Sequence, residues 1–259
     1  MFKSLKKDSF IGRLFYIVKK FFDDDTNYFA ASLSFYTIFS ILPIIALGIA
    51  IISSIPDFDS YLEMFTSYIF DFLNPTHSTE IVETLKNYIS NSSKLGSIGI
   101  FYMIFVFVMF FKDYDYIVNK IHFTKKRAIY KSFFIYIILF IIFPAVFVAL
   151  TVANSFHEFA IVKFLSSFIF TWFMFFSLFK LSVNKKISTK AALISSFGTL
   201  FILAMTKEFF IYYVIHNKTY TTIYGSLATL LFTFLWIYIS WIIYLYGMKF
   251  CHRLNLTLK

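Results

Sequence analysis

The sequence contains little charge, one cysteine and few carboxylates, and each shortage excludes a class of protein. Only 15% of the 259 residues are charged and 59% are hydrophobic, whereas soluble domains carry about 25% charged residues. The lone Cys251 excludes an intrachain disulfide and suits a reducing compartment. Asp and Glu number 14 against 24 Lys and Arg. Because so apolar a surface requires lipid in place of water, the composition predicts an integral membrane protein.

Six apolar stretches are long enough to cross about 30 Å of hydrocarbon as helices. They cover residues 30–54, 95–111, 132–153, 159–181, 191–215 and 223–250. The sequence therefore predicts an all-α, polytopic membrane protein built as a six-transmembrane-helix bundle. Residues 1–29 form a cytoplasmic, interfacial amphipathic arm, residues 30–250 form the transmembrane domain, and residues 251–259 form a short cytoplasmic tail.

Lys and Arg are distributed unevenly over the ends of these stretches and the segments that connect them. The N-terminal arm, the second and fourth loops and the C-terminal end hold 19 of the 24, and the other loops hold 4. Short loops rich in Lys and Arg face the cytoplasm, so these segments are predicted to be cytoplasmic. The net charge of +10 is thus a topology signal. No soluble module is predicted that could use this charge to bind nucleic acid.

The first predicted outer loop, residues 56–94, holds 6 of the 14 acidic residues. Apolar residues recur in it at helical spacing on both sides of Asn74-Pro75. This pattern predicts an amphipathic helical hairpin on the outer face. The hairpin either covers the bundle or acts as a gate or docking surface for a partner or a lipid. Its acidic residues are not paired with a ligand cluster, so they predict no metal site.

The first predicted span has a face of small and polar residues. Ala30, Ser34, Thr37 and Ser40 follow one another at intervals of three and four, which places them on one side of a helix, and Pro43 comes next. Small residues allow two helices to pack closely in lipid. A proline frees a backbone carbonyl and can kink the helix beside a polar cavity. The face therefore serves either tight packing or a polar path.

The fifth predicted span contains Lys207-Glu208, the only charges well inside a span. A charged side chain in the middle of a bilayer costs about 2.5–3.5 kcal/mol. Neighbouring residues lie about 100° apart on a helix, so each charge needs its own partner. Tyr212 is a local donor for Glu208. The two charges predict either a structural contact between helices or contact with a substrate, an ion or a lipid headgroup.

Several of these residues resemble the YihY/BrkB family of bacterial inner-membrane proteins, over nearly the whole chain. The resemblance depends on the run from Ala30 to Pro43, on Lys94 and Lys207, and on Tyr213, Tyr220, Tyr224 and Gly225. It implies a six-helix inner-membrane protein. Some members once carried the label ribonuclease BN, and others are called virulence factors. Gly247-Met248-Lys249 replaces a glycine-small-glutamate sequence of the family, so no role of that acid is carried over.

The residues do not support a nuclease. Metal-dependent hydrolysis of RNA needs clustered carboxylates or histidines. The histidines, at positions 77, 122, 157, 216 and 252, are expected singly at loops or span ends on both sides of the membrane. Asp113-Tyr114-Asp115 resembles a short metal-binding pair, but capping explains it. We therefore predict a protein that is not an enzyme and that has no cofactor and no metal.

The sequence favours a function in transport, or in the handling of lipids or other envelope components, at the bacterial inner membrane. The predicted polar path involves the span-one face and Lys207. The alternative is a scaffold that transports nothing and docks an envelope protein through the outer hairpin. Membrane lipids are expected partners in both cases, and nucleic acid is not. No motif indicates the substrate, the energy source or the oligomeric state.

Overall fold

A computed structural model describes residues 24–52, 96–155, 159–217 and 227–258, together with the single positions 67, 83 and 87. The helices run in the order α2 (Asp24–Ile52), α5 (Gly96–Ile121), α6 (Ile129–Ser155), α7 (Ala160–Leu181), α8 (Thr189–His216) and α10 (Leu227–Thr257). The predicted outer hairpin and the arm before residue 24 lie outside the described residues, apart from those single positions. Each regular element that is described is a helix, so the all-α class is confirmed for this part of the chain.

Four of the helices are long and apolar enough to cross a membrane. The stretches that meet this requirement are Ile129–Asn154, Ile161–Leu181, Thr189–His216 and Ala228–Thr257. Large apolar side chains project from these helices without protein cover; on α6 they include Phe134, Ile138 and Ile141. Such a surface is stable against lipid rather than water. The described part of the chain therefore has the helices and the surface of a membrane protein. The count of six spans stays a prediction.

The last helix, α10, is longer than the predicted span and reaches Thr257. The residues that follow Phe250 contain no glycine or proline to end it. Cys251 and Asn255 continue the buried stripe of α10 one and two turns beyond Met248. Most of the segment predicted as a separate tail, residues 251–259, is therefore part of the final helix.

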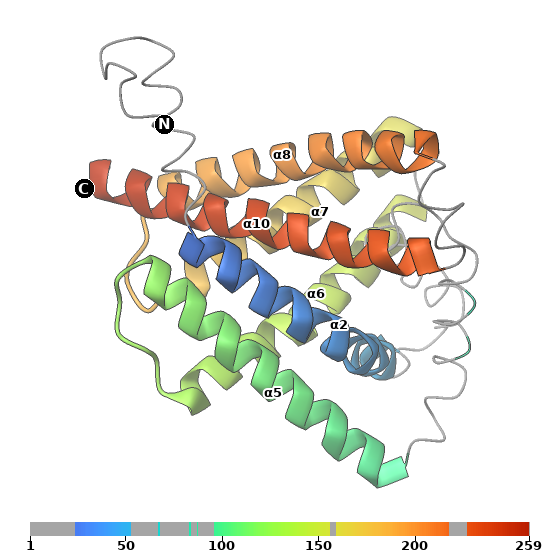
Figure 1. Ribbon diagram of the computed structural model, residues 1–259, viewed down its shortest axis with the longest axis horizontal. Helices are drawn as coiled ribbons and strands as arrows, with labels where there is room; N and C mark the ends of the chain where they lie inside the picture. Colours follow the sequence, from blue (N-terminus) through green and yellow to red (C-terminus); the bar gives the residue numbers. More distant parts are fainter. Residues whose placement is uncertain are drawn as a thin grey trace, which may run out of the picture.

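The helices form a bundle in which α10 is central. Figure 1 shows α10 and α2 side by side, with α8 on one side of this pair and α5 on the other, and with α6 and α7 behind. The largest buried cluster includes Leu33 of α2, Val118 of α5, and Leu245 and Met248 of α10. These side chains bring α2, α5 and α10 together at one end of the bundle.

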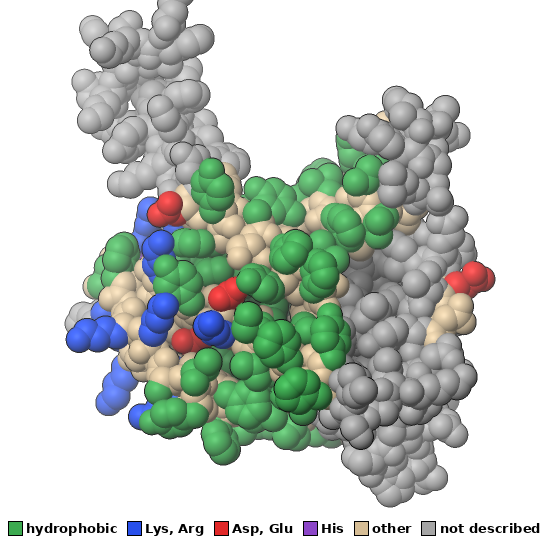
Figure 2. Space-filling model, turned by 60° about the horizontal axis from the view of Figure 1, so that its bottom comes forward, with side chains coloured by type: hydrophobic (Ala, Val, Ile, Leu, Met, Phe, Trp, Pro, Cys, Tyr) green, Lys and Arg blue, Asp and Glu red, His purple; other side chains and the backbone are tan. Residues whose placement is uncertain are grey.

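Lys and Arg residues gather at that same end. The beginning of α2, the α5–α6 loop, the α7–α8 loop and the end of α10 lie together there in Figure 1. Figure 2 shows basic side chains at this end and mostly hydrophobic side chains along the middle of the molecule. We call this region, with residues 112–131, 180–190 and 249–258, the basic end. The segments that the charge pattern predicts on one side of the membrane thus share one end of the bundle.

Candidate functional site

Ala30, Ser34 and Ser40 of the span-one face are buried in the bundle. Ser34 and Thr37 each donate a hydrogen bond to the carbonyl four residues earlier, at 2.6 and 2.7 Å, and Ser40 donates to the Thr37 carbonyl at 3.3 Å. Thr37 also accepts a hydrogen bond from the Trp241 indole of α10 at 2.8 Å. Pro43 lies within α2, and its side chain is outside the described residues. These hydroxyl groups already have partners, which favours packing over a polar path.

Lys207 and Glu208 do not join that face. Lys207 is half-buried and Glu208 is exposed on α8. Within the described residues neither has an ion-pair or hydrogen-bond partner, and the predicted donor Tyr212 instead stacks on His216 with ring centroids 4.0 Å apart. Because α8 packs on α10 and α7, α10 stands between these charges and α2. The structure thus does not combine the two predicted features in one site.

The other predicted positions are divided between the core, the surface and the undescribed segments. Ala30 is fully buried in the main cluster. Tyr213 is exposed and lies edge-on to Phe232, with centroids 6.4 Å apart. The positions outside the described residues are Lys94, Tyr220, Tyr224 and Gly225. The roles of these four undescribed residues stay predictions.

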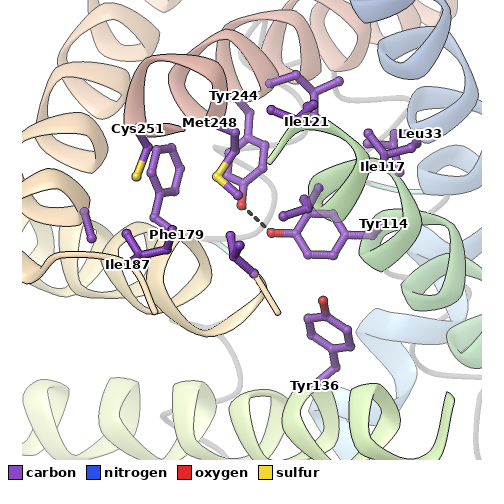
Figure 3. Close-up of a cluster of buried hydrophobic side chains, with 14 of the residues drawn as sticks. Leu33, Tyr114, Ile117, Ile121, Tyr136, Phe179, Ile187, Tyr244, Met248 and Cys251 are labelled. Atoms are coloured by element: carbon purple, nitrogen blue, oxygen red, sulfur yellow. Dashed lines mark hydrogen bonds between the residues drawn. The ribbon is translucent and has the colours of Figure 1, made fainter. Parts of the chain in front are cut away.

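A buried polar cluster occupies the bundle next to the basic end. Tyr114 of α5 shares hydrogen bonds with the Tyr244 hydroxyl of α10 and with the Ser182 hydroxyl, the latter at 3.2 Å. The Tyr136 hydroxyl of α6 donates to the buried carboxylate of Asp115 at 3.0 Å. Figure 3 shows the Tyr114 and Tyr244 hydroxyls facing each other, with Tyr136 below them. Polar groups of α5, α6 and α10 thus meet inside the bundle.

Asn119 connects this cluster to both loops of the basic end. Its amide nitrogen donates to the carbonyl of Asp115 at 2.8 Å and to that of Ser182 at 3.3 Å. Its amide oxygen accepts from the Thr124 hydroxyl and from the Asn184 backbone, each at 2.7 Å. An asparagine side chain offers two donors and one oxygen with two lone pairs, and all are used here. This buried amide therefore holds the α5–α6 and α7–α8 loops in place.

Two histidines meet at the basic end, which corrects the prediction that all five lie singly. The ring centroids of His122 and His252 are 5.3 Å apart. Nδ1 of His122 lies 3.0 Å from the carbonyl of Val118, and its Nε2 is buried without a partner among the described residues. Burial, together with the nearby His252 and Lys185, lowers the pKa of His122 to about 4. The described residues contain no group of three or more metal-ligating side chains around this pair or elsewhere.

A cavity of about 390 Å³ opens between α5 and α6 beside the polar cluster. Its charged lining consists of Lys112, Asp113, Asp115, Lys126 and Arg127. We call it the α5/α6 cavity. The two acids are those of the Asp113-Tyr114-Asp115 tripeptide, which capping was expected to explain; the structure places both residues on the cavity wall. A site with charges of both signs can bind a group that itself carries both signs.

Three uncharged residues, Tyr116, Ile129 and Ser132, complete the lining of this cavity. The Ser132 hydroxyl is buried and has no hydrogen-bond partner in the described part of the chain. The Lys126 ammonium lies 4.3 Å from the centre of the Tyr116 ring, which holds the charge at the cavity. A buried polar group without a partner costs about 1–3 kcal/mol. Ser132 is therefore available to a bound ligand or water.

Sequence reasoning missed most of this site, although a local signal was present. Asp115, Asn119 and His122 follow one another at intervals of four and three where the second apolar stretch ends. This spacing places three polar side chains on one helix face. Their partners on α6 and α10 could not be identified from the sequence, because nothing local indicates which helices are neighbours.

Comparison with known proteins places the whole described bundle in one group. Residues 17–256 match the family described as Virulence factor BrkB. The chain is 29% identical to UPF0761 membrane protein NTHI0384 of Haemophilus influenzae over 94% of each chain. It is 29% identical to UPF0761 membrane protein PSHAa0171 of Pseudoalteromonas translucida, over 89% of this chain and 81% of the relative. No solved structure matches the chain.

Proposed function

Since the chain belongs to the virulence factor BrkB family, we propose that it is a multi-pass protein of the bacterial inner membrane that handles a phospholipid of the envelope. The proposed topology has six spans, a helical hairpin on the outer face and both termini in the cytoplasm. The common location of the basic segments supports it. The relatives are named as membrane proteins and carry no enzymatic name, and we propose no enzymatic activity.

The α5/α6 cavity is the observation that carries this proposal. It combines Asp113 and Asp115 with Lys112 and Lys126 at the end of the bundle that would meet the inner membrane surface. A phospholipid with an amine headgroup carries a phosphate and an ammonium group. The lysines can bind the phosphate, and the carboxylates can accept hydrogen bonds from the ammonium. A simple anion or cation would match the charge of only half of these side chains.

The surroundings of the cavity favour a lipid over a soluble zwitterion. Ile129 lines the cavity and is itself 55% exposed. Tyr130 and Phe134 continue this exposed apolar surface along α6. Acyl chains can therefore extend along α6 from a headgroup bound in the cavity, with no change in the packing of the helices.

The proposal is tested by reconstituting the full chain into phosphatidylcholine vesicles that contain phosphatidylethanolamine labelled on an acyl chain. A quencher outside the vesicles reports how fast this lipid moves between leaflets. We expect the protein to accelerate the movement. Asp113→Asn or Lys126→Gln should slow this movement by about tenfold or more, because each removes one hydrogen bond to a charged group, worth about 1.5–3 kcal/mol.

Lys163→Gln is the matched control, because Lys163 is an exposed lysine at the opposite end of the bundle. It should move lipid at the rate of the unmodified protein. Equal rates for vesicles with and without protein would contradict the proposed function. Equal rates for the cavity variants and the unmodified protein would contradict the proposed site.

A further inference from the structure

A second cavity, of about 650 Å³, lies at the basic end beside α6 and α7. Its charged lining consists of Arg127, Lys180, Lys185 and Lys186, and it contains no carboxylate among the described residues. We call it the α6/α7 cavity. Arg127 also borders the α5/α6 cavity, but the two cavities differ in net charge. Asp113 and Asp115 balance cations in the α5/α6 cavity, whereas the described lining of the α6/α7 cavity has no acidic residue. The α6/α7 cavity therefore suits a group with net negative charge.

The loop that carries two of these lysines is fixed by hydrogen bonds before any ligand arrives. The Arg127 guanidinium donates to the carbonyls of Leu181 and Val183 at 3.0–3.2 Å. The Asn184 amide nitrogen donates to the Lys125 carbonyl at 3.1 Å, in addition to the bond from its backbone to Asn119. Little ordering of the loop is thus needed when a ligand binds, and this preorganisation favours affinity.

The next turn of the same loop is tied to α10. The backbone N–H of Ser188 donates to the Asn255 side chain at 2.7 Å, and Asn255 is buried. The Lys180 ammonium donates to the Thr189 hydroxyl at 2.8 Å and lies 5.6 Å from the centre of the Phe176 ring. The connection between α7 and α8 therefore has a defined shape that surrounds the cavity with positive charge.

The uncharged part of the wall is apolar and continues toward the lipid-facing surface. Ile135 of α6 and Leu181 of α7 line the cavity, and Leu181 is 45% exposed. Nearby on α6, Phe134 and Ile138 are uncovered. A headgroup in the cavity would thus have its acyl chains beside exposed apolar side chains. A soluble phosphate compound would leave that surface unused.

We propose that the α6/α7 cavity binds the phosphate group of an anionic phospholipid, as a site separate from the α5/α6 cavity. Clusters of Lys and Arg where transmembrane helices end are typical of sites for anionic headgroups. Lys185 and Lys186 are exposed and supply positive charge to the ligand. Lys180 is held by its hydrogen bond to Thr189, and Arg127 holds the α7–α8 loop through the Leu181 carbonyl. The bound lipid would join α6 to the α7–α8 connection. This inference depends on the proposed membrane topology but not on movement of lipid through the α5/α6 cavity.

The test uses the full chain in nanodiscs that contain equal amounts of phosphatidylglycerol and phosphatidylcholine. Native mass spectrometry then measures which lipid stays bound after the nanodisc is removed. We expect phosphatidylglycerol to be retained at least about tenfold over phosphatidylcholine, and this preference to fall at least tenfold in Lys185→Gln/Lys186→Gln. Both lysines are exposed, so the double variant should keep the helix content and thermal stability of the unmodified protein.

Lys163→Gln, on the same helix as Lys180 but at its other end, controls for a general loss of charge and should keep the preference. An equal loss in this control would overturn the proposal, as would full retention by the double variant. Displacement of the lipid by millimolar glycerol phosphate would identify a site for soluble phosphate and would also overturn it. Unchanged movement of phosphatidylethanolamine in the double variant is expected, because the α5/α6 cavity does not contain Lys185 or Lys186.

Discussion

The imidazole of His122 is fully buried where the end of α5 meets α10. Its surroundings disfavour the positively charged, doubly protonated ring, because burial removes water from it and because His252 and Lys185 are near. Burial, Lys185 and Arg253 likewise lower the pKa of His252. An unfolded histidine has a pKa of about 6.5, well above the value of about 4 in the folded protein. Between these two values, the unfolded chain binds a proton that the folded chain does not.

We therefore predict that acid destabilises this end of the bundle. The contribution of His122 is complete above about pH 6.5 and is lost as the pH falls toward 4, with a total on the order of 3 kcal/mol. Thermal unfolding in detergent at pH 7.5 and at pH 5 measures the loss. His122→Gln should be less sensitive to acid than the unmodified protein. His216→Gln, which changes an exposed histidine at the opposite end, should keep the full sensitivity. A pH response that is the same in all three proteins would refute this assignment.

At the scale of the helices, α8 and α10 approach each other closely at Gly247. A Cβ atom added there would overlap the hydroxyl of Thr199. Thr199 is buried and donates its own hydrogen bond to the carbonyl of Ser195 at 2.7 Å, so it has little room to move. Small residues between helices permit such contacts in membrane proteins. The glycine that the family resemblance places near the end of the last span thus has a packing role.

We predict that Gly247→Ala separates α8 from α10 and lowers the free energy of unfolding by about 1–3 kcal/mol. Thermal melting in detergent measures this loss. A second change, Thr199→Ala, removes the overlapping hydroxyl and should restore part of the stability. Gly198→Ala is the control, because nothing lies within 4 Å of the added methyl group. If Gly247→Ala melts at the temperature of Gly198→Ala, the close approach is not important for stability.

At the scale of the molecule, the bundle separates charge from apolar surface along its length. The basic loops and the end of α10 share one end, and exposed apolar side chains cover the middle. The interior next to the basic end contains polar side chains that are joined by hydrogen bonds, among them Tyr114, Asp115 and Asn119. Both cavities used in our proposals open at that end. Both cavities are therefore accessible from the same membrane surface.

This arrangement predicts which positions water reaches from each side of the membrane. After replacement of Cys251, single cysteines are placed at Ser34, Lys163 and Asn184 and probed in intact cells with a membrane-impermeant thiol reagent. Position 163 should label in intact cells, position 184 only after the cells are opened, and the buried position 34 in neither state. Labelling at position 184 in intact cells would reverse the proposed orientation. Labelling at position 34 would reveal a water-filled path along α2.

The sequence by itself determined the class of the protein and the positions of its helices. Long apolar stretches need helical hydrogen bonding in lipid, so each described helix contains or overlaps a predicted stretch. The uneven distribution of Lys and Arg also predicted which segments lie together, since charge is counted along the chain and needs no knowledge of contacts. Boundaries were less accurate, as the extension of α10 to Thr257 shows.

Only the tertiary structure decided which polar groups meet. The hydroxyls of Tyr114 and Tyr244 are hydrogen-bonded although the two residues are 130 positions apart in the sequence, and His122 lies beside His252. In a soluble helix, the alternation of polar and apolar residues shows which face turns inward. In a membrane, the core and the lipid are both apolar, so a helix such as α6 is hydrophobic on every side. The inward face of each span, and therefore the site at the basic end, depends on contacts between helices that the local sequence does not encode.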